Sequence, residues 1–124
     1  MISFHNLELH KKEPVYLQIC RFIKQKILIG EIRDYEELPS RRELAMQLSI
    51  NPNTVQKAYK LLEEEGMIRT ISNVKSVIVV NDDIMEKIRS EFVESDIKEF
   101  IQTCKNSGMS FQRVVSLLTK YWDE

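Results

Sequence analysis

Cationic and amide side chains are concentrated between residues 39 and 60, and side chains of these types bind nucleic acid. This interval holds four cations and one carboxylate, namely Arg41, Arg42, Lys57, Lys60 and Glu43. Hydrogen-bonding side chains follow at Asn51, Asn53, Thr54 and Gln56. Cations displace the counterions condensed on DNA phosphates, while Asn and Gln amides can pair with adenine in the major groove. The interval therefore has the chemistry needed to bind duplex DNA.

Two short helices are predicted to position these side chains. Ser40 followed by Glu43 is a capping box, so the first helix should begin at Arg41. Its apolar stripe of Leu44, Ala45 and Leu48 fits about two turns, and Ser49 begins the turn that follows.

The second helix is predicted to begin at Asn51 and Pro52, because Asn is a strong N-cap and Pro is favoured at the first helical position. One face of this helix is apolar and should be buried, with Val55, Ala58, Tyr59 and Leu62 at helical spacing. Gly66 can take the left-handed conformation that ends the helix. The polar side chains listed above remain on the outer faces.

The segments LPSRRELA, NPNTVQKAY and LEEEGMI resemble the GntR family of bacterial transcription regulators, and the short chain is similar to its small YtrA-like branch. The resemblance covers about residues 14–80. It implies a winged helix-turn-helix, in which three helices precede a two-stranded wing. A segment with apolar residues at helical spacing precedes Gly30, as the first of these helices requires. Its apolar residues are Val15, Ile19, Phe22, Ile23 and Ile27. The fold expected is mainly α with a small β-wing, followed by a C-terminal α-helical hairpin.

The wing strands are predicted at MIRT, residues 67–70, and VIVV, residues 77–80. Family wings commonly turn through glycine, whereas this chain has Ser72, Asn73, Val74, Lys75 and Ser76. Asn73 can supply a positive φ in place of glycine. Ser72, Asn73 and Lys75 are the predicted phosphate contacts of the wing.

The resemblance also implies DNA-contacting positions. Arg42, the second Arg of PSRRELA, is implied to contact DNA at the start of its helix; Arg41 stands where the family often has Glu. On the second helix the matching positions are Asn51, Asn53, Thr54 and Gln56, with Lys57 adjacent. Asn51 could instead serve only as an N-cap, and Asn53 and Thr54 could serve only as first-turn residues.

The two parts of the chain differ in charge. The whole chain has a formal net charge of −1 and a pI of about 6.2. Residues 81–124 carry six Lys or Arg and nine Asp or Glu, so the acidic excess lies there and the cations of residues 39–60 are set apart. Two ordinary solvated faces would also account for this pattern. We expect a DNA-binding domain over residues 8–80 and a helical dimerisation segment over residues 81–124.

The C-terminal segment is predicted to form two amphipathic helices. Asp83 and Glu86 could form a capping box, Gly108 should end the first helix, and Ser110 should cap the second. The expected dimer interface comprises Ile88, Phe92, Ile97, Phe100, Ile101, Phe111, Val115, Leu118 and Trp122. A dimer would set two reading helices about 34 to 36 Å apart and read a palindrome. The alternative is a hairpin that completes a monomer's core.

Other sites and locations are not indicated. His5 and His10 have no third ligand nearby, and Cys20 and Cys104 are interpreted as small buried thiols. We expect no cofactor, no metal, no catalytic activity, no membrane span or signal peptide, and a cytoplasmic location.

The leading hypothesis is a sequence-specific transcription regulator, a repressor, which binds a palindromic operator as a homodimer. The resemblance implies control of a nearby transporter operon. An unidentified small-molecule effector is left open, and the alternative function is a winged-helix protein-interaction adaptor.

Overall fold

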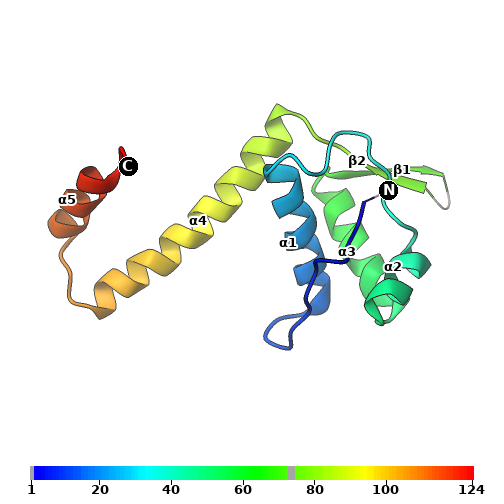
Figure 1. Ribbon diagram of the computed structural model, residues 1–124, viewed down its shortest axis with the longest axis horizontal. Coiled ribbons are helices and arrows are strands. Elements are labelled where there is room, and N and C mark those ends of the chain that lie inside the picture. Colours follow the sequence, from blue (N-terminus) through cyan, green and yellow to red (C-terminus); the bar gives the residue numbers. More distant parts are fainter. Residues whose placement is uncertain (1, 73–74) are drawn as a thin grey trace. The chain divides into compact units, whose positions relative to one another are not determined.

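The computed structural model describes residues 2–72 and 75–124, and its chain divides into two compact units (Figure 1). The first unit is Met1–Ile88 and the second is Arg89–Glu124. The first contains α1 (Val15–Leu28), α2 (Arg41–Leu48), α3 (Pro52–Glu64), β1 (Ile68–Ser72), β2 (Lys75–Ile78) and the start of α4 (Asp82–Asn106). The second contains the rest of α4 and α5 (Phe111–Tyr121). The boundary that we predicted between residues 80 and 81 remains a prediction.

The core of the first unit lies between three helices, with α3 packed against both α1 and α2. Its fully buried side chains include Ile19, Ile23, Leu44, Val55 and Leu62. These residues recur at helical spacing, so each helix buries one face and leaves the other to solvent. The outer face of α3 is thereby held on a rigid support.

A partly buried ion pair joins the C-terminal end of α3 to α1. Lys24 on α1 is only 5% exposed, and its Nζ donates to Glu65 Oε2 at 3.0 Å. Glu65 is the C-cap residue of α3, and the positive φ of Gly66 (+80°) reverses the chain just after it.

The N-terminal arm contributes to the core of the first unit. Ile2 and Phe4 are buried, and the Phe4 ring lies 5.3 Å from the Phe22 ring on α1. The backbone N–H of Ile2 donates to the Glu37 carbonyl at 3.2 Å. The arm therefore packs across α1 and is hydrogen-bonded to the segment that leads to α2.

The wing is a two-stranded antiparallel sheet, with strand bounds that differ from the prediction. Ile68 pairs with Ile78 and Ser72 pairs with Lys75, with an irregularity between Thr70 and Ser72. Met67 lies before β1, and Val79 and Val80 lie after β2. The prediction followed β-branched composition, whereas pairing between the strands sets their ends. Asn73 and Val74 lie outside the described residues, so the proposed positive φ of Asn73 stays a prediction.

The cap of α4 was predicted wrongly. Asn81 Oδ1 accepts from the Ile84 N–H at 2.8 Å, so α4 begins at Asp82 with Asn81 as its cap, not with Asp83 and Glu86 as a capping box. Ile84 and Ile88 are buried in the first unit. Ile88 has no exposed surface and therefore must be removed from the predicted dimer interface.

The second unit leaves its apolar residues open to solvent within the single chain. Gly108 has a φ of +72° between the helices, and Ser110 Oγ accepts from the Arg113 N–H at 3.2 Å, so both predicted signals are confirmed. No residue of α5 is buried. Phe111 and Trp122 are 77% and 80% exposed, and the exposed apolar set also includes Val93, Ile97, Phe100, Ile101, Val115, Leu118 and Tyr121.

Candidate nucleic-acid interface

The start of α2 is fixed by the capping box that the sequence predicts. The Glu43 N–H donates to Ser40 Oγ at 3.1 Å, and the Ser40 N–H donates to Glu43 Oε1 at 3.0 Å. Hydrogen bonding to the Glu43 carboxyl by the Ser40 backbone N–H and, second, by the Ser40 side chain holds the pKa of that carboxyl below its usual range. Because α2 begins at Arg41, the arginines at 41 and 42 project from the first turn of this helix.

A tight turn joins α2 to α3 and sets the angle between them. Ser49 adopts a left-handed conformation with a φ of +56°, and the Ile50 N–H donates back to the Ala45 carbonyl at 3.0 Å. Asn51 then caps α3, since its Oδ1 accepts from the Asn53 N–H at 2.8 Å. The cap occupies the amide oxygen of Asn51. Asn51 therefore has a structural role as the cap of α3, and this role competes with its predicted contact to a base.

The predicted reading residues lie together on α3, on the face away from the core. Asn53, Gln56 and Lys57 are exposed, and Thr54 is half-buried. Among these residues, the Gln56 side chain has no hydrogen bond to any residue in the described part of the chain. Its carboxamide can therefore donate and accept toward an external partner without first breaking a contact.

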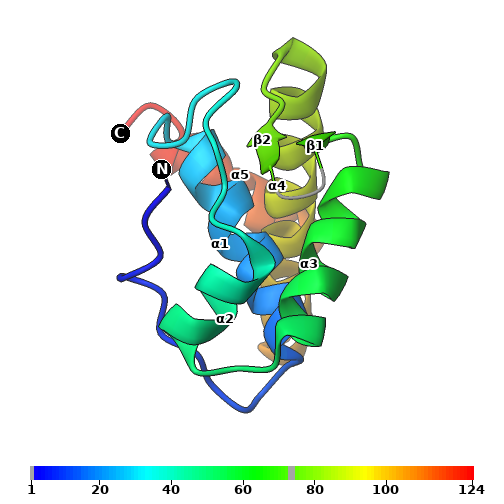
Figure 2. The same ribbon diagram turned by 90° about the vertical axis from the view of Figure 1, so that its right-hand side faces the viewer.

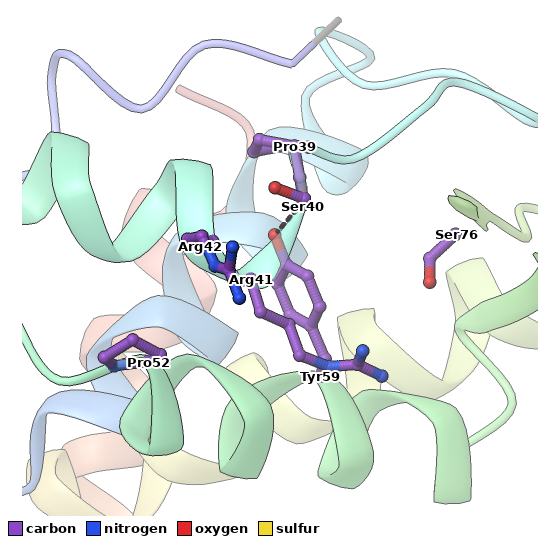
Figure 3. Close-up of a pocket in the computed structure, with 7 residues that line it drawn as sticks. All are labelled: Pro39, Ser40, Arg41, Arg42, Pro52, Tyr59 and Ser76. Atoms are coloured by element: carbon purple, nitrogen blue, oxygen red, sulfur yellow. Dashed lines mark hydrogen bonds between the residues drawn. The ribbon is translucent and has the colours of Figure 1, made fainter. Parts of the chain in front are cut away.

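A hollow of about 450 Å³ lies between the start of α2, the start of α3 and the wing (Figure 3). It is lined by Pro39, Ser40, Arg41, Arg42, Pro52, Tyr59 and Ser76. The Tyr59 hydroxyl donates to the Pro39 carbonyl at 2.8 Å and so closes one side of the hollow. The guanidinium groups of two lining arginines make the hollow suited to an anion such as a backbone phosphate.

Arg41 has a particular place in this hollow. Its Nε is buried and has no hydrogen-bond partner among the described residues. Burial raises the pKa of the Tyr59 phenol well above its usual range, and the nearby charge of Arg41 opposes this rise. A buried donor without a partner is costly. An acceptor entering the hollow would relieve that cost.

Lys57 has a neighbour that the sequence pattern did not predict. Its Nζ lies 4.2 Å from the centroid of the Tyr16 ring on α1, a cation–π contact. Tyr16 is two residues into the Pro-Val-Tyr start of α1, and helical periodicity gave no reason to single it out. Only the packing of α1 against α3 brings these two residues together.

The wing residues are only partly described. Ser72 and Lys75 are exposed, whereas Asn73 lies outside the described residues. Lys75 Nζ is 3.9 Å from Glu37 Oε2, a long contact that leaves its ammonium available to another anion.

The remaining candidate groups form no second site in the part of the chain that is described. There, no cluster of three or more His, Cys, Asp or Glu side chains is arranged to hold a metal ion. His5 and His10 are exposed. Cys20 is buried with its thiol 3.5 Å from the Ala58 carbonyl, and Cys104 is half-buried. None of the described helices is long and apolar enough to cross a membrane.

The model of the family described as "Bacterial regulatory proteins, gntR family" matches residues 15–78. The HTH-type transcriptional repressor YtrA of Bacillus subtilis is 33% identical over 102 residues, which are 82% of this chain and 78% of that protein. A GntR family transcriptional regulator from Listeria monocytogenes superposes with a TM-score of 0.75 at 27% identity, covering 90% of this chain and 98% of that one. A transcriptional regulator from Oenococcus oeni superposes with a TM-score of 0.74 at 31% identity, covering 94% and 98%. These matches and the elements described above confirm the predicted fold class.

Proposed function

This chain belongs to the gntR family of bacterial regulatory proteins, and from that premise we propose that it is a sequence-specific DNA-binding repressor acting as a homodimer. The observation that carries the proposal is the exposed polar face of α3 beside the hollow lined by Arg41 and Arg42. Amides on the outer face of a helix can read base edges in the major groove, and the two arginines beside them can bind the phosphates.

Each side chain takes a role that follows from its chemistry. Gln56 and Asn53 read base edges, because a carboxamide can pair with adenine in a bidentate manner. Arg42, Arg41 and Lys57 bind backbone phosphates and set the register of α3 in the groove. The polar residues Asn51, Thr54, Ser72, Asn73 and Lys75 supply the remaining backbone contacts.

The second unit provides the dimer contact in this proposal. Large apolar side chains on α4 and α5, Phe100 and Leu118 among them, are 46% and 48% exposed in the single chain. Exposed large apolar side chains gathered on two helices in this way mark an interaction site. A second copy of the chain would cover it with an identical surface, as two-fold symmetric dimers do. The expected interface is Phe92, Ile97, Phe100, Ile101, Phe111, Val115, Leu118 and Trp122.

A dimer of this kind fits a palindromic operator, because two-fold symmetry in the protein matches two-fold symmetry in the DNA. The relative from Bacillus subtilis is described as a transcriptional repressor. We assign the same direction of control to this chain, place it in the cytoplasm, and propose a transporter operon as its target and an unidentified small molecule as its effector. We assign no catalytic activity.

Selection of bound sequences from a random duplex library tests this function. Enrichment of a two-fold symmetric site supports sequence-specific binding and dimerisation together. Enrichment of a single half-site would support sequence-specific binding but contradict dimerisation. The absence of any enrichment would overturn the proposal and favour a protein-interaction adaptor. A Gln56→Ala variant selected in parallel should enrich a site that is degenerate at one base pair of each half.

A further inference from the structure

A short basic loop precedes α1, at residues 10–13 with the sequence His-Lys-Lys-Glu, and a buried glutamine fixes its shape. Gln18 on α1 is only 4% exposed. Its Oε1 accepts from the His10 N–H at 3.0 Å, and its Nε2 donates to the carbonyls of His10 and Glu13 at 2.8 and 2.9 Å. The backbone of the basic loop is therefore tied at both ends to one side chain, so the loop has a defined conformation.

Two positive charges of the basic loop face solvent. Lys11 and Lys12 are exposed, and neither ammonium forms an ion pair with a residue that the structure describes. The carboxylate of Glu13 is engaged by both terminal nitrogens of Arg21, and this hydrogen bonding lowers the pKa of Glu13. The acidic residue of the loop is thus neutralised by Arg21 on α1, and the two lysines remain uncompensated by it.

The basic loop lies next to the part of α3 that would enter DNA. α1 and α3 pack side by side, with their N-terminal ends at the same edge of the first unit (Figure 2). The contact between Lys57 and the Tyr16 ring, 4.2 Å from Nζ to the ring centroid, joins the first turn of α1 to the second turn of α3. Lys57 and the two loop lysines therefore extend the cationic surface from α3 to the start of α1.

We propose that the basic loop is an additional DNA-backbone contact, in which Lys11 and Lys12 bind phosphates beside the groove that α3 occupies. Lysine presents a mobile point charge on a flexible stem, so the contact adds affinity for any sequence and no base selectivity. The loop lies outside residues 15–78, which match the family model. The inference rests on the proposed DNA binding.

The experiment compares salt dependence for the full-length wild type, a Lys11→Ala/Lys12→Ala variant and an Arg113→Ala/Lys120→Ala control, on a selected duplex and on random duplex. The control removes the same number of positive charges from exposed positions of α5. Each lost phosphate contact should lower the magnitude of the slope of log K against log salt by about 0.9. We expect the loop variant to lose about 1.8 per subunit, and about tenfold or more in affinity on both duplexes near 0.1 M salt.

Three results would overturn the inference. They are a wild-type slope in the loop variant, an equal loss of slope in the α5 control, or a loss confined to the selected duplex. The first would mean that the lysines are merely solvated, and the second that only net charge matters. The third would make them base-reading groups. Thermal unfolding of both variants checks that each is folded. Failure of the wild type to prefer the selected duplex would instead contradict the proposed function, while the slopes on random duplex would still test the loop.

Discussion

Tyr59 on α3 donates its hydroxyl hydrogen to the carbonyl of Pro39, just before the cap of α2, at a distance of 2.8 Å. Tyr59 is 4% exposed, so this hydrogen bond is made inside the protein. It joins α3 to the residue that precedes the cap of α2. It couples the position of α3 to the first turn of α2. The arginines at the start of α2 are thereby held at a fixed distance from the outer face of α3.

Replacing this hydroxyl should lower stability. We expect Tyr59→Phe to reduce the free energy of unfolding by about 1 to 2 kcal/mol, because the buried Pro39 carbonyl loses its donor. Urea denaturation followed by circular dichroism measures the change. Tyr35→Phe is the matched control, since Tyr35 is 59% exposed and should change stability by less than about 0.5 kcal/mol. Equal stabilities for wild type and Tyr59→Phe would show that the bond contributes nothing net.

The capping box should make stability depend on pH in the acid range. Hydrogen bonds from the Ser40 N–H and side chain lower the folded-state pKa of Glu43. A lowered pKa contributes stability that is complete above the unfolded value of about 4.3 and is lost as the pH falls through the folded value. Wild type should therefore exceed Glu43→Gln in stability at pH 6, and the difference should shrink progressively as the pH falls below the unfolded value of about 4.3.

Thermal unfolding at a series of pH values measures that difference. Glu8→Gln is the control, because Glu8 is an exposed carboxyl of the N-terminal arm and caps no helix. Its stability should differ little from wild type at any pH in the series. A Glu43→Gln variant whose deficit is the same at pH 6 and pH 3 would contradict the assignment of the effect to the ionised carboxylate.

Helices α2 and α3 could be predicted because the sequence signals that start them are local. The capping box of Ser40 and Glu43 and the Asn-Pro start of α3 each involve residues within four positions of one another. Hydrogen bonds over such short separations form wherever the chain becomes helical. The buried face of α3 followed from 3.6-residue periodicity, which needs no knowledge of its partner.

The features that were missed depend on residues far apart in the chain. Lys57 contacts Tyr16 across 41 positions, and Phe4 packs on Phe22 through the fold of the arm. Ile88 lies nine residues, about two and a half turns, before Ile97, so the two side chains leave α4 on opposite sides, and Ile88 is buried in the first unit. Helical spacing separates these two faces, but only the tertiary structure shows which of them is covered. The same dependence on tertiary packing accounts for the shifted ends of the wing strands.

Substitutions at Arg42 and Gln56 should change different properties of DNA binding. Arg42→Ala should lower affinity for every duplex, whereas Gln56→Ala should lower selectivity among sequences. Arg42→Ala should weaken binding to all duplexes and lower the magnitude of the salt slope by about 0.9 per subunit, because it removes a phosphate contact. Gln56→Ala should leave the slope unchanged and relax selectivity at one base pair, at a cost of about 1 to 3 kcal/mol.

Fluorescence anisotropy on selected and random duplexes measures both quantities. Arg113→Ala serves as the control for loss of a positive charge, since Arg113 is an exposed residue of α5. If Gln56→Ala lowers affinity equally on both duplexes, Gln56 contacts the backbone and does not read a base. If Arg42→Ala leaves the slope unchanged, its guanidinium does not bind phosphate.

Substitutions at Leu118 and Ile88 should have different effects, since Leu118 is expected to contribute to dimerisation and Ile88 to the stability of the folded chain. Leu118 is 48% exposed on α5, so Leu118→Glu should leave each chain folded but place a charge in the interface between copies. Sedimentation velocity should show a monomer at concentrations where wild type and the control Lys120→Glu are dimers. Ile88→Ala should instead lower the free energy of unfolding by about 2 to 5 kcal/mol, because the side chain fills the core of the first unit. Unfolding must be compared at one protomer concentration, since a dimer's stability depends on it. A dimeric Leu118→Glu would place the interface elsewhere on the chain.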